Sequence, residues 1–207
     1  MEPIPIVVVL ESDLDLCAAI EKLVSDAGLQ VVTCRSASEF FAALRADQPG
    51  CIVANTHMPG LSGIELHERL VAVGIQTPVI IISAHGDVPA AVRAMRSGAV
   101  DFIQKPFVPQ VLLDRIREAI ARDARIREDQ RLKAAIRRRI ECLTPREKQV
   151  LQLIVSGKAN KEVAATLRVS AKTVEVHRAH VMKKLEAETV AELVRMAIIS
   201  ESDRTTT

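Results

Sequence analysis

Asn55 is the most informative residue of this 207-residue chain, because it ends an apolar run and begins a loop rich in Pro and Gly. The run, residues 51–54, is typical of a short buried strand, and Pro59, Gly60 and Gly63 mark the turn that follows. In an open parallel sheet, ligands and reactive groups gather outside the carboxyl ends of the strands. Asn55 offers an amide at such an end, and an amide is neither a nucleophile for phosphoryl transfer nor a charged ligand for Mg²⁺.

The elements that must position Asn55 alternate regularly along the first half of the chain. Five apolar runs of strand length alternate with amphipathic segments of helix length, which predicts an α/β fold with a doubly wound, five-stranded parallel sheet. The expected strands are Ile4–Leu10, Gln30–Cys34, Cys51–Asn55, Pro78–Ile82 and Asp101–Ile103, and the expected helices are 13–27, 37–47, 63–73, 87–97 and one from 108 onward.

Local signals support several of these helix ends. The Ser-x-x-Glu spacing of a capping box occurs at Ser36…Glu39 and again at Ser62…Glu65. Gly28 follows the first expected helix, where a glycine commonly ends a helix.

The segment CIVANTHMPGLSG, residues 51–63, resembles the phosphoacceptor segment of two-component receiver domains. In that family the position of Asn55 is an aspartate that becomes an acyl phosphate, and a pair of acidic residues at the end of the first strand holds Mg²⁺. The matching pair here is Glu11 and Ser12, and Asp13 should already point into the first helix. One of three family charges remains, so the resemblance implies weak or absent metal binding and a receiver that phosphate does not switch in the usual way. We expect no cofactor.

Other receiver landmarks persist. Ser83 matches the family's switch hydroxyl, Lys105 matches the lysine that pairs with the phosphoryl group, and Phe102 matches the aromatic residue whose rotamer reports the switch state. The resemblance also implies a cis Lys105–Pro106 bond. A structural role is the alternative for all three: the lysine bonds the Asn55 carbonyl, the serine caps the following helix, and Phe102 packs in the core.

Two histidines, His57 and His85, flank the same expected pocket. They could titrate near neutral pH or bind a ligand, and as lone histidines they are more often ordinary loop residues.

Composition sets outer limits on function. The sequence has no apolar run of membrane-spanning length, and its first ten residues lack the charged start of a signal peptide. The four cysteines show no CxxC or zinc spacing, which favours reduced cysteines in a cytoplasmic protein. Without Trp or Tyr, recognition of single strands by base stacking is not expected. The sequence contains no nucleophile–base pair or Gly-rich phosphate loop, so we do not expect an enzyme.

Charge is divided unevenly between the two halves. Residues 1–122 carry 10 basic and 14 acidic residues, a net of −4, whereas residues 123–207 carry 18 and 12, a net of +6. This division predicts a polyanionic partner for the second half only.

The segment 108–141 is expected to be helical throughout. It lacks glycine, and its one proline, Pro109, suits a first helical turn. We expect the last receiver helix to continue into a linker, 123–142, and the imperfect apolar stripe of the whole segment to form a coiled-coil-like dimer seam. A solvated single helix with a flexible break near Arg137–Arg139 is the alternative. The stripe comprises Val111, Leu112, Ile116, Ala119, Ile120, Asp123, Ile126 and Leu132.

The region 143–207 begins with a clear helix start. Thr144 is the expected N-cap, Pro145 the first helical residue and Glu147 the residue that closes a capping box. Gly157 is expected to end this helix. The predicted buried face consists of Val150, Leu151, Leu153 and Ile154.

Three further helices follow. A short helix, Lys161–Leu167, is expected to be capped by Asn160, and a longer basic helix, Ala171–Leu185, by Ser170. A fourth helix is expected at Val190–Ile199. A short helix, a tight turn and a longer basic helix form a helix-turn-helix arrangement.

The segments LTPREKQVL (143–151), NKEVAATLRVSAKTVEVHRAHVMKKL (160–185) and AELVRMA (191–197) closely resemble the LuxR-type DNA-binding domain. Together with the receiver-like half, 1–122, the layout is similar to that of FixJ/NarL-type response regulators over almost the whole chain.

The expected recognition helix has two faces. An inward stripe contains Val174, Val181 and Leu185, with His177 partly included. The opposite face matches positions that meet base edges in this family: Glu175, Val176 and Ala179. Side chains better placed for phosphates are Lys172, Thr173, Arg178 and Lys183, with Lys161 on the preceding helix.

The sequence thus predicts a cytoplasmic, sequence-specific transcription regulator that binds double-stranded DNA as a homodimer, independently of phosphorylation. Two alternatives use the same residues. The Glu11/Asn55/Lys105 pocket could bind a small ligand as the input signal. The chain could instead be an interaction module that titrates a histidine kinase or a sister regulator without reading DNA.

Overall fold

The computed structural model describes residues 4–45 and 48–202, and the chain divides into two compact units between Arg127 and Glu128. Each unit has its own hydrophobic core. The outer limits of the predicted domains, residues 1 and 207, and the end of the predicted helix 37–47 lie outside the described residues. No helix in the described part of the chain combines the length and apolar character needed to cross a bilayer.

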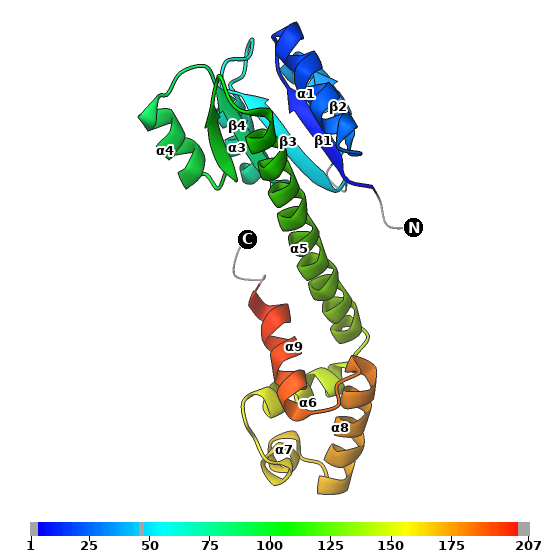
Figure 1. Cartoon of the computed structure of the whole chain (residues 1–207). Helices are drawn as coiled ribbons and strands as arrows, with labels where there is room; N and C mark the ends of the chain where they lie inside the picture. Colours follow the sequence, from blue (N-terminus) through cyan, green and yellow to red (C-terminus); the bar gives the residue numbers. More distant parts are fainter. Residues whose placement is uncertain (1–3, 46–47, 203–207) are drawn as a thin grey trace. The chain divides into compact units, whose positions relative to one another are not determined.

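The first unit contains a five-stranded, fully parallel sheet in the order β2-β1-β3-β4-β5 (Figure 1), which confirms the predicted fold class. After β2, at one edge, the chain passes over β1 and enters β3, which pairs with the other side of β1. The strands β4 and β5 then extend the sheet to its second edge. The strands are β1 (Ile6–Leu10), β2 (Gln30–Cys34), β3 (Gly50–Asn55), β4 (Val79–Ser83) and β5 (Asp101–Gln104).

Alternate residues of the strands enter two separate cores. In β3, Ile52 and Ala54 join the core under α2, α3 and α4, whereas Cys51 and Val53 join the core under α1 and α5. Because both faces are covered, β3 and β4 are buried along their whole length, which explains why they appear as continuous apolar runs. The helices are α1 (Leu14–Asp26), α2 (Ala37–Ala43), α3 (Gly63–Ala72), α4 (Val88–Arg96) and α5 (Pro109–Glu141).

Two predicted helix ends of the first unit are confirmed, and a third is confirmed in part. Ser62 and Glu65 form a complete capping box, and Gly28 follows the first helix in a left-handed conformation with φ of 76°. Ser36 accepts from the backbone N–H of Glu39, but the Glu39 carboxylate accepts from the backbone N–H of Arg35 instead of that of Ser36. The second half of the predicted box at Ser36 is therefore wrong.

A buried carboxylate ties α5 to the start of β3. Asp123 is 2 % exposed, and its Oδ2 accepts from the backbone N–H of Gly50 at 2.9 Å and from Nε of Arg127 at 2.7 Å. Arg127 also donates to the carbonyl of Gln48. Gly50 has φ of 141°, and a Cβ there would lie 1.9 Å from the carbonyl oxygen of Ile6, so only glycine fits. Asp123 therefore belongs to the packing of the first unit.

The helix α5 continues without interruption to Glu141, so the alternative of a break near Arg137–Arg139 is wrong. Its last turns belong to the second unit. Ile140 packs against the core of that unit, and Arg139 forms an ion pair with Glu186. Asp123, which interrupts the apolar stripe in the sequence, has its partners in the first unit.

The second unit is helical. Its elements after α5 are α6 (Pro145–Val155), α7 (Asn160–Leu167), α8 (Ala171–Leu185) and α9 (Val190–Ser202). Val150, Leu151 and Ile154 of α6 are buried as predicted, whereas Leu153 is only partly buried.

We expect Asp123→Ala to lower the free energy of unfolding of the first unit by roughly 2–3 kcal/mol, because Gly50 and Arg127 would lose a buried charged acceptor. Urea denaturation followed by circular dichroism measures the change. Asp114→Ala on the same helix is the matched control, because the Asp114 side chain is 59 % exposed and its loss should change stability by less than about 0.5 kcal/mol. Equal effects of the two substitutions would contradict the structural role of Asp123.

Candidate functional site

The carboxyl ends of β1, β3, β4 and β5 bring the predicted pocket residues of the first unit together. Glu11 follows β1 and is fully buried, Asn55 ends β3 at 6 % exposure, and Ser83 ends β4 at 2 % exposure. Lys105 follows β5 and has a partly buried side chain. At the base of the pocket, α3 approaches closely: a Cβ on Gly63 would lie 2.6 Å from the carbonyl oxygen of Asn55.

Glu11 is the hub of this pocket. Its Oε1 accepts from Nδ2 of Asn55 at 2.8 Å and from the backbone N–H of Asp13 at 3.0 Å. Its Oε2 accepts from Nζ of Lys105 at 2.6 Å. The expected hydrogen bond between Lys105 and the Asn55 carbonyl is therefore wrong: an ammonium group forms a stronger hydrogen bond with a carboxylate than with a neutral amide.

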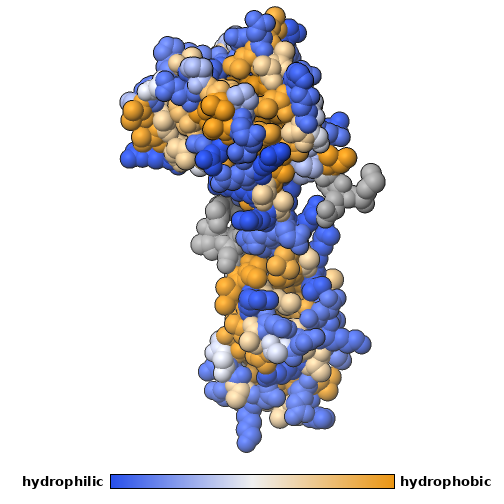
Figure 2. Space-filling model, in the orientation of Figure 1, coloured by the Kyte–Doolittle hydropathy of each residue, from blue (hydrophilic) through white to orange (hydrophobic). Residues whose placement is uncertain are grey.

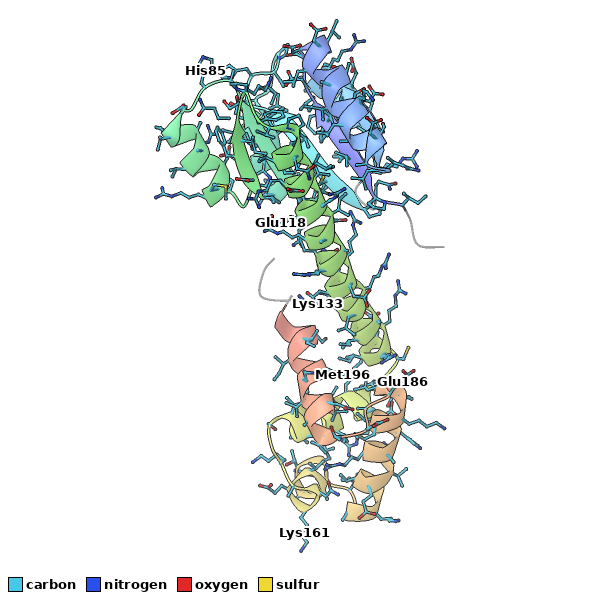
Figure 3. The ribbon with its side chains drawn as sticks, in the orientation of Figure 1. His85, Glu118, Lys133, Lys161, Glu186 and Met196 are labelled. Carbon is cyan, nitrogen blue, oxygen red and sulfur yellow. The ribbon has the colours of Figure 1, made fainter. Side chains whose placement is uncertain are left out.

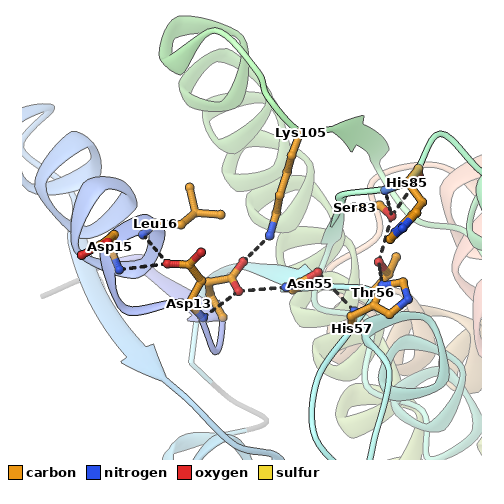
Figure 4. Close-up of polar contacts among 10 residues, drawn as sticks. Asp13, Asp15, Leu16, Asn55, Thr56, His57, Ser83, His85 and Lys105 are labelled. Carbon is orange, nitrogen blue, oxygen red and sulfur yellow. Dashed lines mark hydrogen bonds and ion pairs between the residues drawn. The ribbon is translucent and has the colours of Figure 1, made fainter.

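The side chain of Asn55 uses both of its polar atoms within the pocket. Its Nδ2 donates to Glu11, and its Oδ1 accepts from the backbone N–H of His57 at 3.1 Å. Figure 4 shows these contacts as a continuous series from Asp13 to His57. An aspartate could not donate to Glu11 in this way, so the amide suits the arrangement observed.

The residues after Glu11 do not restore an acidic pair. Ser12 is exposed, and Asp13 is the N-cap of α1, where its carboxylate accepts from the backbone N–H groups of Asp15 and Leu16. Asp13 thus points into the first helix, as predicted.

The donor set does not fit Mg²⁺, which receiver domains bind. Mg²⁺ prefers carboxylate oxygens in octahedral geometry. The single acidic side chain of the pocket, Glu11, already accepts three hydrogen bonds, one of them from the cation Lys105. In the part of the chain that the structure describes, no group of three or more His, Cys, Asp or Glu residues is arranged to hold a metal.

Ser83 lies in a second, hydroxyl-containing part of the pocket. Its Oγ accepts from Oγ1 of Thr56 at 2.9 Å and donates to the carbonyl of His85 at 3.0 Å. The predicted capping of the next helix by Ser83 is wrong, because the N-cap of α4 is Asp87. Thr56 was missed by the sequence analysis, although it directly follows Asn55.

The two loop histidines lie next to each other, with ring centroids 5.2 Å apart. His57 is exposed, and its Nδ1 contacts Oγ1 of Thr56 at 2.9 Å.

Phe102 is partly buried and packs against the core under α2, α3 and α4. The Lys105–Pro106 bond is cis, as predicted.

The second unit positions α8 through its caps and an apolar face. Ser170 is the N-cap of α8 and accepts from the backbone N–H of Thr173, as predicted. Val174, Val181 and Leu185 are fully buried, which confirms the inward stripe. The N-cap of α7 is Ala159, so the predicted cap at Asn160 is wrong. The amide oxygen of Asn160 instead accepts from Arg178 at 2.9 Å and joins α7 to α8.

The opposite face of α8 is open. Glu175, Ala179 and Val176 are exposed, Val176 by 46 %. Lys172 and Lys183 are also exposed, while Thr173 and Arg178 are partly buried. Lys172 forms an ion pair with Glu175 at 3.2 Å. In Figure 3, the side chain of Lys161 points away from α7 and from the rest of the second unit. Hydrophilic residues cover much of the visible surface of this unit (Figure 2).

An ion pair between a buried carboxylate and an exposed lysine, which the sequence did not predict, links α6 to the last turn of α8. Glu147 is 4 % exposed and closes the predicted capping box with Thr144. Its Oε2 also accepts from Nζ of Lys184 at 2.7 Å. The pKa of Glu147 is lowered from 4.5 to about 2. The largest cause is the hydrogen bond from Lys184, and the second largest is the hydrogen bond from the backbone N–H of Thr144. Lys184 therefore has a structural role within the unit, unlike its neighbour Lys183.

Comparison with protein families agrees with both units. Residues 7–117 match the response regulator receiver domain, and residues 141–197 match the bacterial regulatory proteins of the luxR family. The chain therefore belongs to the two-component response regulators with a LuxR-type DNA-binding domain.

Individual relatives span nearly the same length. The chain is 42 % identical to nodulation protein W of Bradyrhizobium diazoefficiens over 93 % of this chain and 85 % of that protein. It is 40 % identical to the transcriptional regulatory protein FixJ of Azorhizobium caulinodans, covering 93 % and 91 % of the two chains. The low-resolution structure of the response regulator StyR, 40 % identical, superposes with a TM-score of 0.83 over 93 % of this chain and 98 % of that one.

We expect Glu147→Gln to lower the stability of the second unit by about 2–3 kcal/mol at neutral pH. Because the folded-state pKa is depressed, the stabilisation is present above pH 4.5 and is lost as the pH falls toward 2. The difference between native protein and variant should therefore narrow over that range, as measured by calorimetry at a series of pH values. Glu188→Gln, at an exposed position, is the control. A difference that stays constant down to pH 2 would rule out this ionisation as its cause.

Proposed function

We propose that this response regulator binds specific DNA sequences without being switched by phosphorylation. The observation that carries the proposal is the set of contacts around Glu11. Asn55, at the position that the family resemblance assigns to the phosphoacceptor, donates its amide to Glu11, and Lys105 pairs with the other carboxylate oxygen. Neither an acceptor nucleophile nor a free acidic pair for Mg²⁺ is offered at this position.

The same contacts argue against a ligand in the Glu11/Asn55/Lys105 pocket as the input. Both oxygens of Glu11, both polar atoms of Asn55 and the ammonium group of Lys105 already have partners. A ligand would have to replace buried, charge-assisted hydrogen bonds, which are strong.

For DNA recognition we propose that α8 enters the major groove with its exposed face. Glu175 would accept from a cytosine amino group, Val176 would contact a thymine methyl group, and Ala179 would allow close approach. Phosphate contacts would come from Lys161, Lys172, Thr173 and Lys183. Arg178 is a weaker candidate, because it already donates to Asn160.

We further propose that the regulator acts as a homodimer whose formation depends on concentration or on a partner, not on phosphate. The unbroken helix α5 and its exposed Leu132, 53 % accessible, support a helical seam between two copies.

Phosphorylation independence is tested by gel shift at fixed salt, with and without acetyl phosphate and Mg²⁺. We expect the same half-saturating protein concentration in both conditions and no phosphoryl group by mass spectrometry. Strict dependence of DNA binding on the phosphodonor would refute the proposal. Asn55→Asp is the informative variant. If this variant becomes phosphorylated, the receiver has lost phosphorylation through the change at the acceptor position alone. If the variant stays unphosphorylated, Ser12 contributes to that loss as well.

DNA reading by α8 is tested on operators selected from random DNA. We expect Lys183→Ala to weaken binding to all sequences similarly and to reduce the slope of log K against log salt by about 0.9. Val176→Ala should instead change sequence preference, with about 1–3 kcal/mol less discrimination at one base pair.

The control is Lys148→Ala, which removes an exposed lysine from α6, outside the helix-turn-helix. If the α8 variants regulate as well as the native chain, an interaction module that does not read DNA becomes the better description.

A further inference from the structure

Two histidines meet at the carboxyl edge of the sheet, on loops that follow different strands. His57 lies on the loop after β3 and His85 on the loop after β4, and both residues are exposed. Their ring centroids lie 5.2 Å apart, and Figure 4 shows the two rings next to each other beside Thr56 and Ser83. Neutral imidazole is the commonest metal ligand in proteins, so a histidine pair at this distance is a candidate metal site.

A directed series of hydrogen bonds fixes the tautomer of His57. Oγ of Ser83 donates its only proton to the carbonyl oxygen of His85 at 3.0 Å. Oγ1 of Thr56 therefore donates to Oγ of Ser83 at 2.9 Å, and it accepts from Nδ1 of His57, also at 2.9 Å. Nδ1 carries the proton, so Nε2 of the neutral ring is the nitrogen with a lone pair.

This arrangement matches the surroundings of a metal-binding histidine, which almost always donates its second ring N–H to a fixed acceptor. The acceptor here, Thr56, is 8 % exposed and is held in turn by the buried Ser83. The ring of His85 forms no hydrogen bond with any residue that the structure describes. Either nitrogen of that ring can therefore serve as the second ligand.

The separation of the two rings favours a tetrahedral ion. An ion about 2.0–2.1 Å from one nitrogen of each ring, with the tetrahedral angle between the two bonds, places the ring centres about 5 Å apart. Adjacent ligands of an octahedral ion subtend a smaller angle, which would bring the rings closer together. Zn²⁺ is the tetrahedral ion that binds imidazole, whereas Mg²⁺ prefers oxygen ligands.

We propose that His57 and His85 bind a zinc ion, with water at its two remaining positions. The ion joins the loop after β3 to the loop after β4, which the contact between Thr56 and Ser83 already connects. It uses neither the carboxylate of Glu11 nor a phosphoryl group, so the proposal does not rest on phosphorylation independence. A site with only two protein ligands is open to solvent, unlike a structural site with four, which suits reversible binding of zinc.

The test is a titration of the isotope-labelled full chain with Zn²⁺ at neutral pH, followed by NMR. The amide signals of residues 56–58 and 84–86 should shift together and reach saturation, because these backbone groups adjoin the two rings. Mg²⁺ at the same concentration should leave these signals unchanged. The proposal is overturned if Zn²⁺ shifts the signals of neither loop, or of one loop only.

His57→Ala and His85→Ala locate the ligands, and both change exposed residues. Each should weaken zinc binding, measured from the same amide signals, by at least about tenfold, because only one imidazole is left. His180→Ala on α8, where the side chain is 58 % exposed, is the matched control and should have no effect. Native affinity in either His57→Ala or His85→Ala would also overturn the proposal.

Two substitutions of Thr56 test whether its hydroxyl orients the ring of His57. Thr56→Val should weaken zinc binding by about tenfold or more, as expected when the second ring N–H of a ligand loses its acceptor. Thr56→Ser keeps the hydroxyl and should retain the native affinity. Equal affinities of these two variants would contradict the positioning role of Thr56.

Discussion

A single buried carboxylate, that of Glu11, constrains the carboxyl edge of the sheet. A fully buried negative charge is stable only if it is paired and fully hydrogen-bonded. Glu11 meets this requirement by drawing Lys105 from β5, Asn55 from β3 and the backbone of Asp13 toward one point. The positive charge that balances Glu11 therefore comes from the chain itself, and this one carboxylate orients two side chains, those of Asn55 and Lys105, at the ends of two other strands.

The fold follows closely from the sequence, because its signals are periodic and local. Apolar runs, Gly and Pro positions and Ser-x-x-Glu spacings predict the strands to within two residues at either end and most helix starts. One error arises because a side chain has a better partner far along the chain. Asn160 is well suited to an N-cap, yet it binds Arg178 18 residues later, and Ala159 takes the cap position.

The site was predictable as a set of residues but less so as a set of contacts. Resemblance identified Glu11, Asn55, Ser83 and Lys105, which the structure brings to one edge of the sheet. The pairing of Lys105 with Glu11 joins residues 94 positions apart, and no local pattern encodes it. Asp123 gave a weak signal as a polar interruption in an apolar stripe, but its partner Gly50 lies 73 positions away. Glu147 was assigned only its local capping role, because its ion pair with Lys184 is a tertiary contact.

The anchor formed by Gly50, Asp123 and Arg127 has a consequence for the construction of hybrid regulators. Since Gly50 admits no side chain and Asp123 holds its backbone, the helical phase of α5 is set at this point relative to the sheet. Each residue added to α5 or removed from it beyond Arg127 would rotate the part of the helix that follows by about 100° around the helix axis. A junction that joins this receiver to a different output module should therefore fall after Arg127 and change the helix length only by whole turns.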